Sequence, residues 1–204
     1  YVDGFALKGT PLFSYSYYDM NSVYRKFWNR AAHWRRPVLL GKGNIMGKTK
    51  RISDSYTEQV YVIRSSQING YGRLFGGQLM QWIDETAGVV GRRHCEGTVT
   101  TAAIDTLNFK GPAYQNDMLV LVGRITYIGR SSMEIRIDTY VENSDGLRRS
   151  INRAYVVMVA IDEKGVPMEV PRIEFDTLTV SEKAEWENGK KRYELRKKRK
   201  QEGF

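Results

Sequence analysis

The central part of the chain alternates between hydrophobic and polar positions in a way that predicts β-strands. In residues 132–142, side chains such as Met133 and Ile135 alternate with polar ones, as expected of a strand that buries one face. Segments 143–146 and 162–165 each end in glycine and are typical of hairpin turns. Comparable runs predict further strands at residues 59–64, 98–109, 117–128 and 150–161.

Residues 76–92 have the period of a helix instead. Apolar or small side chains recur every three or four positions and form one broad face, made of Leu79, Trp82, Ile83, Thr86, Ala87 and Val90. The opposite face is polar and includes Gln81, Glu85 and Arg92. One strand, one helix and four strands joined by short turns predict an α+β fold, in which an antiparallel sheet packs against a single helix.

The two ends of the chain differ from this central part. Residues 1–45 are rich in Tyr, Trp and Arg without a regular period, and we expect them to form an N-terminal extension. Residues 46–178 form the predicted domain. Residues 179–204 are predicted to be a basic C-terminal helix or tail. We expect this helix to be solvated, because pairs such as Glu187 and Lys191 are spaced for contacts along one helical face.

The net charge of +9 would suit a nucleic-acid-binding protein, but the excess positive charge lies at the two ends of the chain and not in the predicted domain. Residues 1–45 carry a net charge of +5 and residues 181–204 a net charge of +4, while residues 46–180 are neutral. The predicted domain therefore lacks the basic surface that phosphate backbones require, and we expect no nucleic-acid partner.

Hydropathy and cysteine content favour a cytoplasmic protein. Mean hydropathy is −0.49, no apolar run approaches the ~20 residues of a spanning helix, and no apolar stretch resembles a secretory signal. We therefore expect no membrane partner. The single cysteine, Cys95, cannot form an internal disulfide, which fits a reducing compartment. His33 and His94 are the two histidines, and with so few ligands we expect no metal site.

Asp84 belongs to neither face of the predicted helix. Its neighbours at helical spacing are mostly small, including Gly77, Ala87, Gly88 and Gly91, so another backbone can approach closely there. A carboxylate in such a place loses water, which is costly unless other groups compensate. Asp84 is therefore a candidate catalytic acid or base. The alternative is that Asp84 lies at the rim of the helix beside Glu85, with both carboxylates in contact with water.

A glycine-rich loop precedes the helix and offers a second candidate. Gly76 and Gly77 open the helix, where free N–H groups and the helix dipole favour an anion. The oxygen of a thioester carbonyl becomes such an anion during hydrolysis. The segment has neither the lysine of a phosphate-binding loop nor the Gly-x-Ser-x-Gly elbow of serine hydrolases.

The stretch from Asn69 to Gly88 resembles the signature of the hotdog-fold acyl-CoA thioesterases. The matching positions are Asn69, Gly72, Phe75, Gly76, Gly77, Leu79, Met80, Asp84, Glu85, Ala87 and Gly88. Residues 108–112 resemble the family's strand-end segment, and residues 129–132 resemble its loop between two long strands. The resemblance covers roughly residues 56–175 and leaves out both tails.

This resemblance implies a fold, an activity and an assembly. The fold is a five-stranded antiparallel sheet wrapped around one long helix. The activity is hydrolysis of acyl-CoA to free CoA and a carboxylic acid, without a cofactor. Asp84 acts as general base or nucleophile, Asn69 comes from the other subunit, and the Gly77 N–H contacts the thioester oxygen. The active protein is a homodimer with a continuous sheet, often assembled into a trimer of dimers, which is a hexamer.

We expect two segments of the chain to bind coenzyme A. Phe75 and Gly76 belong to the helix-opening motif. Arg130, Ser131 and Ser132 place a guanidinium and hydroxyl groups in one short turn, and Arg forks suit phosphate oxygens. The alternative is that Arg130 merely solvates the end of a hairpin.

Two other functions compete, because a fold does not decide an activity. A hotdog hydratase or dehydratase needs a histidine near a helix acid, and His94 lies beyond the end of the predicted helix. A non-catalytic acyl-CoA-binding module would usually lack the acid at position 84 and would carry a DNA-binding segment. The basic N-terminal residues show no such pattern.

Overall fold

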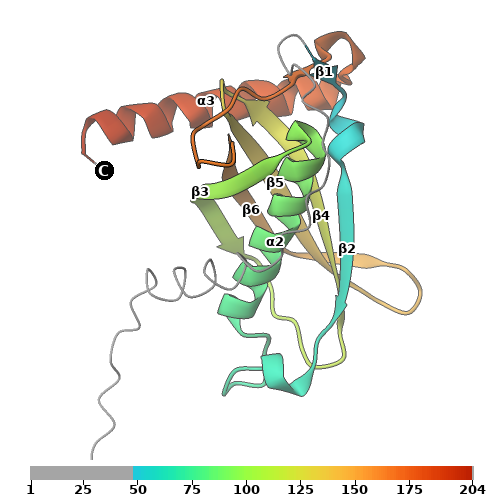
Figure 1. The fold of residues 1–204 in the computed structure, drawn as a ribbon. Coiled ribbons are helices and arrows are strands. Elements are labelled where there is room, and N and C mark those ends of the chain that lie inside the picture. The colour runs from blue at the N-terminus through green and yellow to red at the C-terminus, as the bar shows by residue number, and fades with distance from the viewer. Residues whose placement is uncertain (1–47, 204) are drawn as a thin grey trace, which may run out of the picture. The chain divides into compact units, whose positions relative to one another are not determined.

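The computed structural model describes residues 48–203 and has the expected α+β architecture (Figure 1). Five antiparallel strands form one sheet in the order β2-β4-β5-β6-β3. The strands are β2 (Thr57–Val62), β3 (Thr98–Phe109), β4 (Met118–Ile128), β5 (Ser132–Glu142) and β6 (Arg148–Ile161). All four long strands predicted from the alternation are therefore present, with boundaries within about two residues of the expected ones.

Helix α2 (Gly76–Cys95) lies across the inner face of the sheet (Figure 1). Its predicted apolar face is buried. The buried residues of that face are Leu79, Trp82, Ile83, Thr86, Ala87 and Val90. The helix is one turn longer than the predicted 76–92, because His94 and Cys95 are also buried. It ends where Glu96 adopts a left-handed conformation (φ 55°) and donates its N–H to the Arg92 carbonyl, which satisfies one of the last free carbonyls.

Two tight turns, a small second sheet and short 3-10 helices complete the fold. Gly146 and Gly165 have φ values of 81° and 79°, a backbone conformation that favours glycine, and they close the two predicted turns. Strands β1 (Thr49–Lys50) and β7 (Arg172–Ile173) form a two-stranded parallel sheet. Three short 3-10 helices are η1 (Ile52–Ser55), η2 (Ser65–Gln67) and η3 (Phe175–Thr177).

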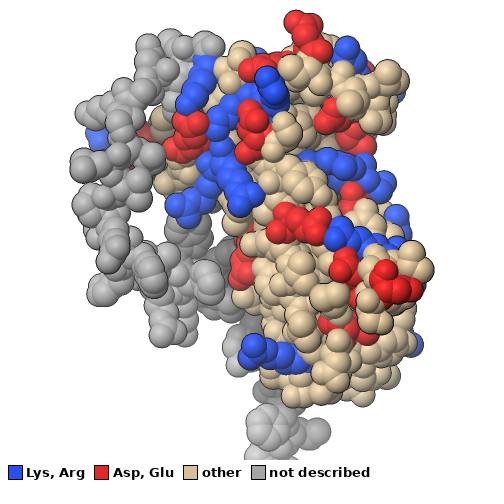
Figure 2. Space-filling view, turned by 90° about the vertical axis from the view of Figure 1, so that its right-hand side faces the viewer, with Lys and Arg blue, Asp and Glu red and all other residues tan. Residues whose placement is uncertain are grey.

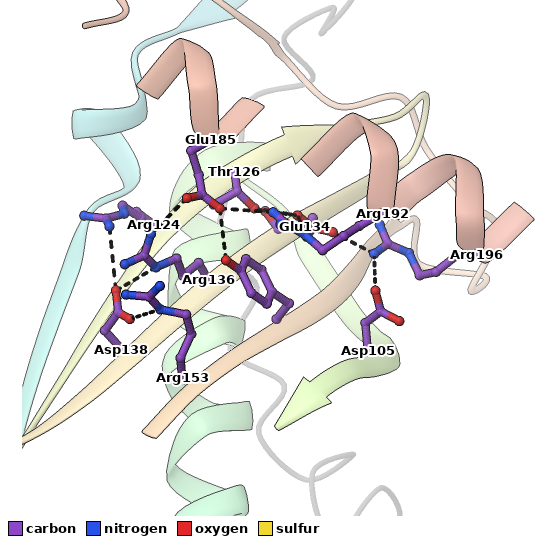
Figure 3. Close-up of polar contacts among 11 residues, drawn as sticks. Asp105, Arg124, Thr126, Glu134, Arg136, Asp138, Arg153, Glu185, Arg192 and Arg196 are labelled. Atoms are coloured by element: carbon purple, nitrogen blue, oxygen red, sulfur yellow. Dashed lines mark hydrogen bonds and ion pairs between the residues drawn. The ribbon is translucent and has the colours of Figure 1, made fainter. Parts of the chain in front are cut away.

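The C-terminal helix α3 (Val180–Gln201) corrects one expectation. It begins at a Thr179–Glu182 capping box and is not solvated on all sides. It lies against the outer face of the sheet (Figures 1 and 3), where Gly189 is buried: a side chain there would come within 2.7 Å of Tyr127 Cβ. The helix is therefore a packed layer of the fold.

Charged side chains carry much of this contact (Figure 3). Glu134 of β5 is 2% exposed, and its carboxylate accepts hydrogen bonds from Arg192 (2.8 Å) and Arg196 (2.6 Å) of α3. Asp138 is equally buried and pairs within the sheet with Arg136 at 2.8 Å and Arg153 at 2.6 Å, and Arg136 in turn donates to Glu185 of α3 at 2.9 Å. Strand β5 thus alternates as predicted, but its polar side faces α3 and not water. The pairing is what makes buried charges tolerable.

Surface charges of both signs are interspersed on the face shown in Figure 2. Ion pairs between partly exposed side chains include Arg148 with Glu58 (2.7 Å) and with Glu142 (2.5 Å). Among residues 48–203, no helix is long and apolar enough to cross a membrane. The proposed domain limits at residues 45 and 178 stay predictions, and the N-terminal extension lies outside the described residues.

Candidate active site

Asp84 and Thr101 meet between α2 and the edge strand β3. The Thr101 hydroxyl donates a hydrogen bond of 2.6 Å to Asp84 Oδ1 and lies 3.4 Å from Met158 Sδ. Both Asp84 and Thr101 are half-buried, so the carboxylate is oriented by the strand without being sealed from solvent. Its second oxygen, Oδ2, has no hydrogen-bond partner within residues 48–203 and is available to a water molecule or substrate.

The small residues near Asp84 serve two different purposes. Ala87 is fully buried, and Gly91 packs against Val99, with 3.3 Å between the position of an added Cβ and Val99 Cγ1. Both belong to the core of this chain, where the close approach expected beside Asp84 is made by its own strands. Gly88 has open space where a side chain would lie, so close approach by another chain is possible at that residue.

The N-terminus of α2 has the free N–H groups expected of an anion site. The helix starts after Phe75, whose carbonyl accepts hydrogen bonds from Gln78 N (3.0 Å) and Leu79 N (3.2 Å). The N–H groups of Gly76 and Gly77 have no acceptor among the described residues. A side chain at position 77 would collide with the Phe75 ring. Glycine there lets the aromatic ring lie over the helix start.

Asn69 shapes the loop before this helix. Its Oδ1 accepts hydrogen bonds from the N–H groups of Tyr71 (2.9 Å) and Arg73 (3.2 Å), while Gly72 turns the chain with φ 71°. This leaves the Asn69 Nδ2 group without an acceptor within the described part of the chain. Asn69 also lines an open cavity of about 280 Å³ that is otherwise largely apolar, formed with Arg73, Leu74, Leu79, Phe109, Gly111, Pro112, Ala113 and Ile151.

Within one chain the predicted site residues fall into separate groups. Phe75, Gly76 and Gly77 lie together at the start of α2, and an added Cβ at Gly76 would lie 3.5 Å from the Phe109 ring. Asp84 is two helical turns further along, and no contact in the described part of the chain joins it to Asn69. This separation is compatible with a site that draws Asn69 from a second subunit.

The turn at residues 129–132 forms a third group. Arg130 is exposed, with 84% of its side chain accessible, and its Nε donates to Glu169 at 2.9 Å. The carbonyl of Ser131 accepts a hydrogen bond from Ala160 N at 2.9 Å. Among residues 48–203, no contact links Arg130, Ser131 or Ser132 to Asp84.

His94 and Cys95 are components of the core. His94 is fully buried and its Nε2 lies 3.0 Å from the Pro171 carbonyl oxygen. Burial lowers the pKa of this imidazole, and the hydrogen bond to Pro171 opposes that effect in part. Burial likewise raises the pKa of the Cys95 thiol. Among residues 48–203, no three His, Cys, Asp or Glu side chains cluster as a metal site would require.

Comparisons with known proteins place this arrangement in a family. The model of the thioesterase superfamily matches residues 71–146. An acyl-CoA thioester hydrolase of Bacillus subtilis is 32% identical over 124 residues, which are 58% of this chain and 72% of that protein. The chain belongs to the acyl-CoA thioester hydrolases of the thioesterase superfamily.

Other relatives add detail on coverage and fold. The mouse cytosolic acyl coenzyme A thioester hydrolase is 33% identical over 156 residues, but the match covers 74% of this chain and 40% of that protein. The acyl-CoA hydrolase of Staphylococcus aureus, solved with butyryl-CoA and CoA, has a TM-score of 0.71 at 29% identity, covering 76% of this chain and 94% of that one. A solved hexameric acyl-CoA thioesterase has a TM-score of 0.70 at 35% identity, covering 74% and 97%. These neighbours confirm the hotdog fold.

Sequence reasoning missed Thr101 as part of the site. Thr101 lies 17 positions after Asp84, and their contact depends on how β3 is placed beside α2. A threonine in a strand is common, so no local signal singled it out.

Proposed function

We propose that this chain is an acyl-CoA thioesterase, which hydrolyses the thioester to free CoA and a carboxylic acid in the cytoplasm. The observation that carries the proposal is the half-buried Asp84 carboxylate, oriented by Thr101 through one oxygen and open at the other. Family membership supports the reaction class, and the cytosolic mouse relative supports the compartment.

The chemistry assigned to these groups is simple acyl transfer to water. As a general base, Asp84 takes a proton from a water molecule whose oxygen bonds to the carbonyl carbon. As a nucleophile, Asp84 bonds to that carbon itself, and water then cleaves the resulting anhydride. In both routes the C–S bond breaks, the sulfur leaves as the CoA thiolate, and it gains a proton. The Gly77 N–H polarises the carbonyl oxygen as negative charge develops there.

The second subunit completes this site in the proposal. The Asn69 Nδ2 donor, from the partner chain, orients the water or the substrate carbonyl. The Staphylococcus aureus hydrolase has been solved as separate alanine variants of an asparagine, an aspartate and a threonine. Those three residues follow one another at the same intervals as Asn69, Asp84 and Thr101 here, which supports treating the three as one unit.

The proposed assembly is a homodimer joined through the free edge of β3, with a trimer of dimers as the larger form. Within the described residues β3 pairs with β6 alone, and an unpaired strand edge is a template for another chain. Ile104 and Phe109 on this strand are 37% and 57% exposed. The hexameric relatives support the larger assembly.

Coenzyme A is proposed to bind along Phe75, Gly76 and the turn of Arg130, Ser131 and Ser132. Arg130 is sufficiently exposed to meet a phosphate, although its present partner is Glu169. The open cavity beside Asn69 offers apolar surface to the rest of the substrate.

The test of the proposed function is release of free thiol from acyl-CoA by the purified chain, measured over a series of acyl lengths. Turnover of at least one acyl-CoA is expected. A protein that binds acyl-CoA in calorimetry but releases no thiol would instead be a non-catalytic binding module. A hydratase is not favoured, because His94 is buried against Pro171 and away from Asp84.

A further inference from the structure

Asp105 is a buried carboxylate on the strand edge that faces the proposed partner. It lies in β3 at a register irregularity between Ile104 and Thr106, and its side chain is 7% exposed. Two guanidiniums of α3 hold it: Arg196 Nη1 at 2.9 Å from Oδ2 and Arg199 Nη2 at 2.6 Å from Oδ1. Figure 3 shows Asp105 and Arg196 facing each other between β3 and α3.

The charge state of this group follows from its surroundings. Burial raises the pKa of Asp105, but the hydrogen bonds from Arg199 and Arg196 outweigh it and hold the pKa below its usual value. The carboxylate is therefore ionised at neutral pH. Arg199 remains 53% exposed, and a guanidinium has five N–H donors, so it retains donors for a second acceptor.

The position of Asp105 relative to a second copy follows from the shared catalytic site. Asn69 and Phe109 line the same cavity, and Asp84 is bonded to Thr101. If Asn69 of one subunit reaches Asp84 of the other, Phe109 of the first subunit lies opposite Thr101 of the second. In an antiparallel β3–β3 pair, that register puts the two-fold axis midway between these positions, which is at Asp105.

We propose that Asp105, Arg196 and Arg199 form an ionic latch at the dimer axis, through which α3 of each subunit holds the edge strands of both. The inference rests on the proposed intersubunit site. It assigns α3 an interaction surface whose partner is a second copy of this chain.

The latch answers an electrostatic problem that this register creates. Residues directly opposite in an antiparallel pair have Cα atoms about 4.5–5.5 Å apart, and two like charges in that position repel. Each Asp105 brings two arginines, so the axis carries four guanidiniums for two carboxylates. Figure 1 shows α3 continuing past β3, and Arg199 in the last turn of α3 donates to Asp105 at 2.6 Å, so the end of this helix lies beside the edge strand.

Disulfide cross-linking tests the register without relying on enzyme activity. The native Cys95 is buried, so we expect the parent chain to form no disulfide-linked dimer under the same oxidation. Asp105→Cys should form a covalent dimer on mild oxidation, because the expected Cα separation lies within the roughly 4.4–6.8 Å range of disulfides. Thr98→Cys, at the start of β3, should not cross-link. Cross-linking at Thr98 and none at Asp105 would place the axis elsewhere and overturn the proposal.

Dimer dissociation tests the latch itself. Arg199→Ala should weaken the dimer about tenfold in sedimentation over a dilution series, and Asp105→Asn should do the same. The double variant should be no weaker than Asp105→Asn alone, because Asp105→Asn already removes the acceptor that Arg199 contacts. Lys198→Ala is the matched control: the side chain of that lysine is 70% exposed and pairs with Glu202 just after α3. If Arg199→Ala dissociates no more readily than Lys198→Ala, the contact serves a single chain and the latch is wrong.

These results are separable from the proposed function. A chain that cross-links at Asp105 but hydrolyses no acyl-CoA retains the latch and loses the thioesterase assignment. A chain that hydrolyses acyl-CoA but fails both dimer tests retains the activity and loses the latch.

Discussion

The Thr101 hydroxyl donates a 2.6 Å hydrogen bond to Asp84 Oδ1 and joins the edge strand to the central helix at the candidate site. A hydrogen bond to a carboxylate is stronger than a bond between neutral groups, so this contact fixes the orientation of Asp84. Because Thr101 occupies one carboxylate oxygen, the proposed reaction would use the other oxygen.

Loss of the Thr101 hydroxyl should slow catalysis more than it weakens substrate binding. Thr101→Val preserves the shape of the side chain but removes the donor to Asp84. We expect kcat to fall about tenfold with KM changed little, as when an interaction made in the transition state is removed. Thr101→Ser should recover most of the rate. Equal kcat for Thr101→Val and the parent, in steady-state assays, would show that the hydroxyl does not orient the carboxylate.

Asn69 should act across the subunit interface. Asn69→Ala and Asp84→Asn should each be strongly impaired as pure proteins. Mixed dimers of the two variants contain one site with both native side chains, so about half the parent activity per mixed dimer is expected. Subunit exchange must be verified by mass spectrometry of differently tagged chains. Complete exchange without recovered activity would place Asn69 and Asp84 in the same chain's site, or Asn69 outside it.

Arg130 should contribute to binding and little to chemistry. Arg130→Ala is expected to raise KM for acyl-CoA several-fold, to weaken the salt dependence of KM and to leave kcat nearly unchanged, because uniform binding energy is lost. The comparison substrate is an acyl-pantetheine thioester, which has no nucleotide. Equal effects on both substrates would show that Arg130 supports structure, through its pair with Glu169, and not the nucleotide.

Gly189 should be intolerant of even a methyl group. In an exposed helix Gly→Ala stabilises by about 1 kcal/mol. Here an added Cβ would lie 2.7 Å from Tyr127 Cβ and 3.0 Å from the Thr126 carbonyl oxygen, so Gly189→Ala should lower the unfolding temperature. Asn188→Ala, at the exposed neighbouring position, is the control and should have little effect. Thermal unfolding followed by circular dichroism measures both, and a stabilised Gly189→Ala variant would mean that α3 is not docked.

The parts of the fold set by local periodicity could be predicted from sequence, and the parts set by tertiary contact could not. Helix α2 and the four long strands were recognisable because burial of one face leaves a repeat in the sequence. The docking of α3 left no such repeat, because the residues it turns toward the sheet include Arg192 and Arg196. These are buried through ion pairs with Glu134, whose own position in the strand pattern was typical of a solvent-facing residue.

The candidate site divides in the same way. Asp84 and Gly77 stood out through their place on a predicted helix and through the family motif. Thr101 did not, because only the placement of β3 beside α2 brings it to Asp84. The exposed turn at Arg130 was predicted as a hairpin end, and its relation to Asp84 would be set by the proposed dimer.

The central claim is that Asp84 performs the chemistry, and the most direct measurement compares kcat of Asp84→Asn with that of the parent on the acyl-CoA the parent hydrolyses fastest. The amide nearly preserves the shape of the side chain and can still accept a hydrogen bond from Thr101, but it cannot take a proton.

Glu85→Gln, on the exposed face of the same helix, is the matched control and should retain full activity. Loss of a general base typically costs about 10²-fold or more. We therefore predict that Asp84→Asn loses at least about 10²-fold in kcat while its circular dichroism spectrum and unfolding temperature stay close to those of the parent. A folded Asp84→Asn protein that keeps more than about a tenth of the parent kcat would contradict the account.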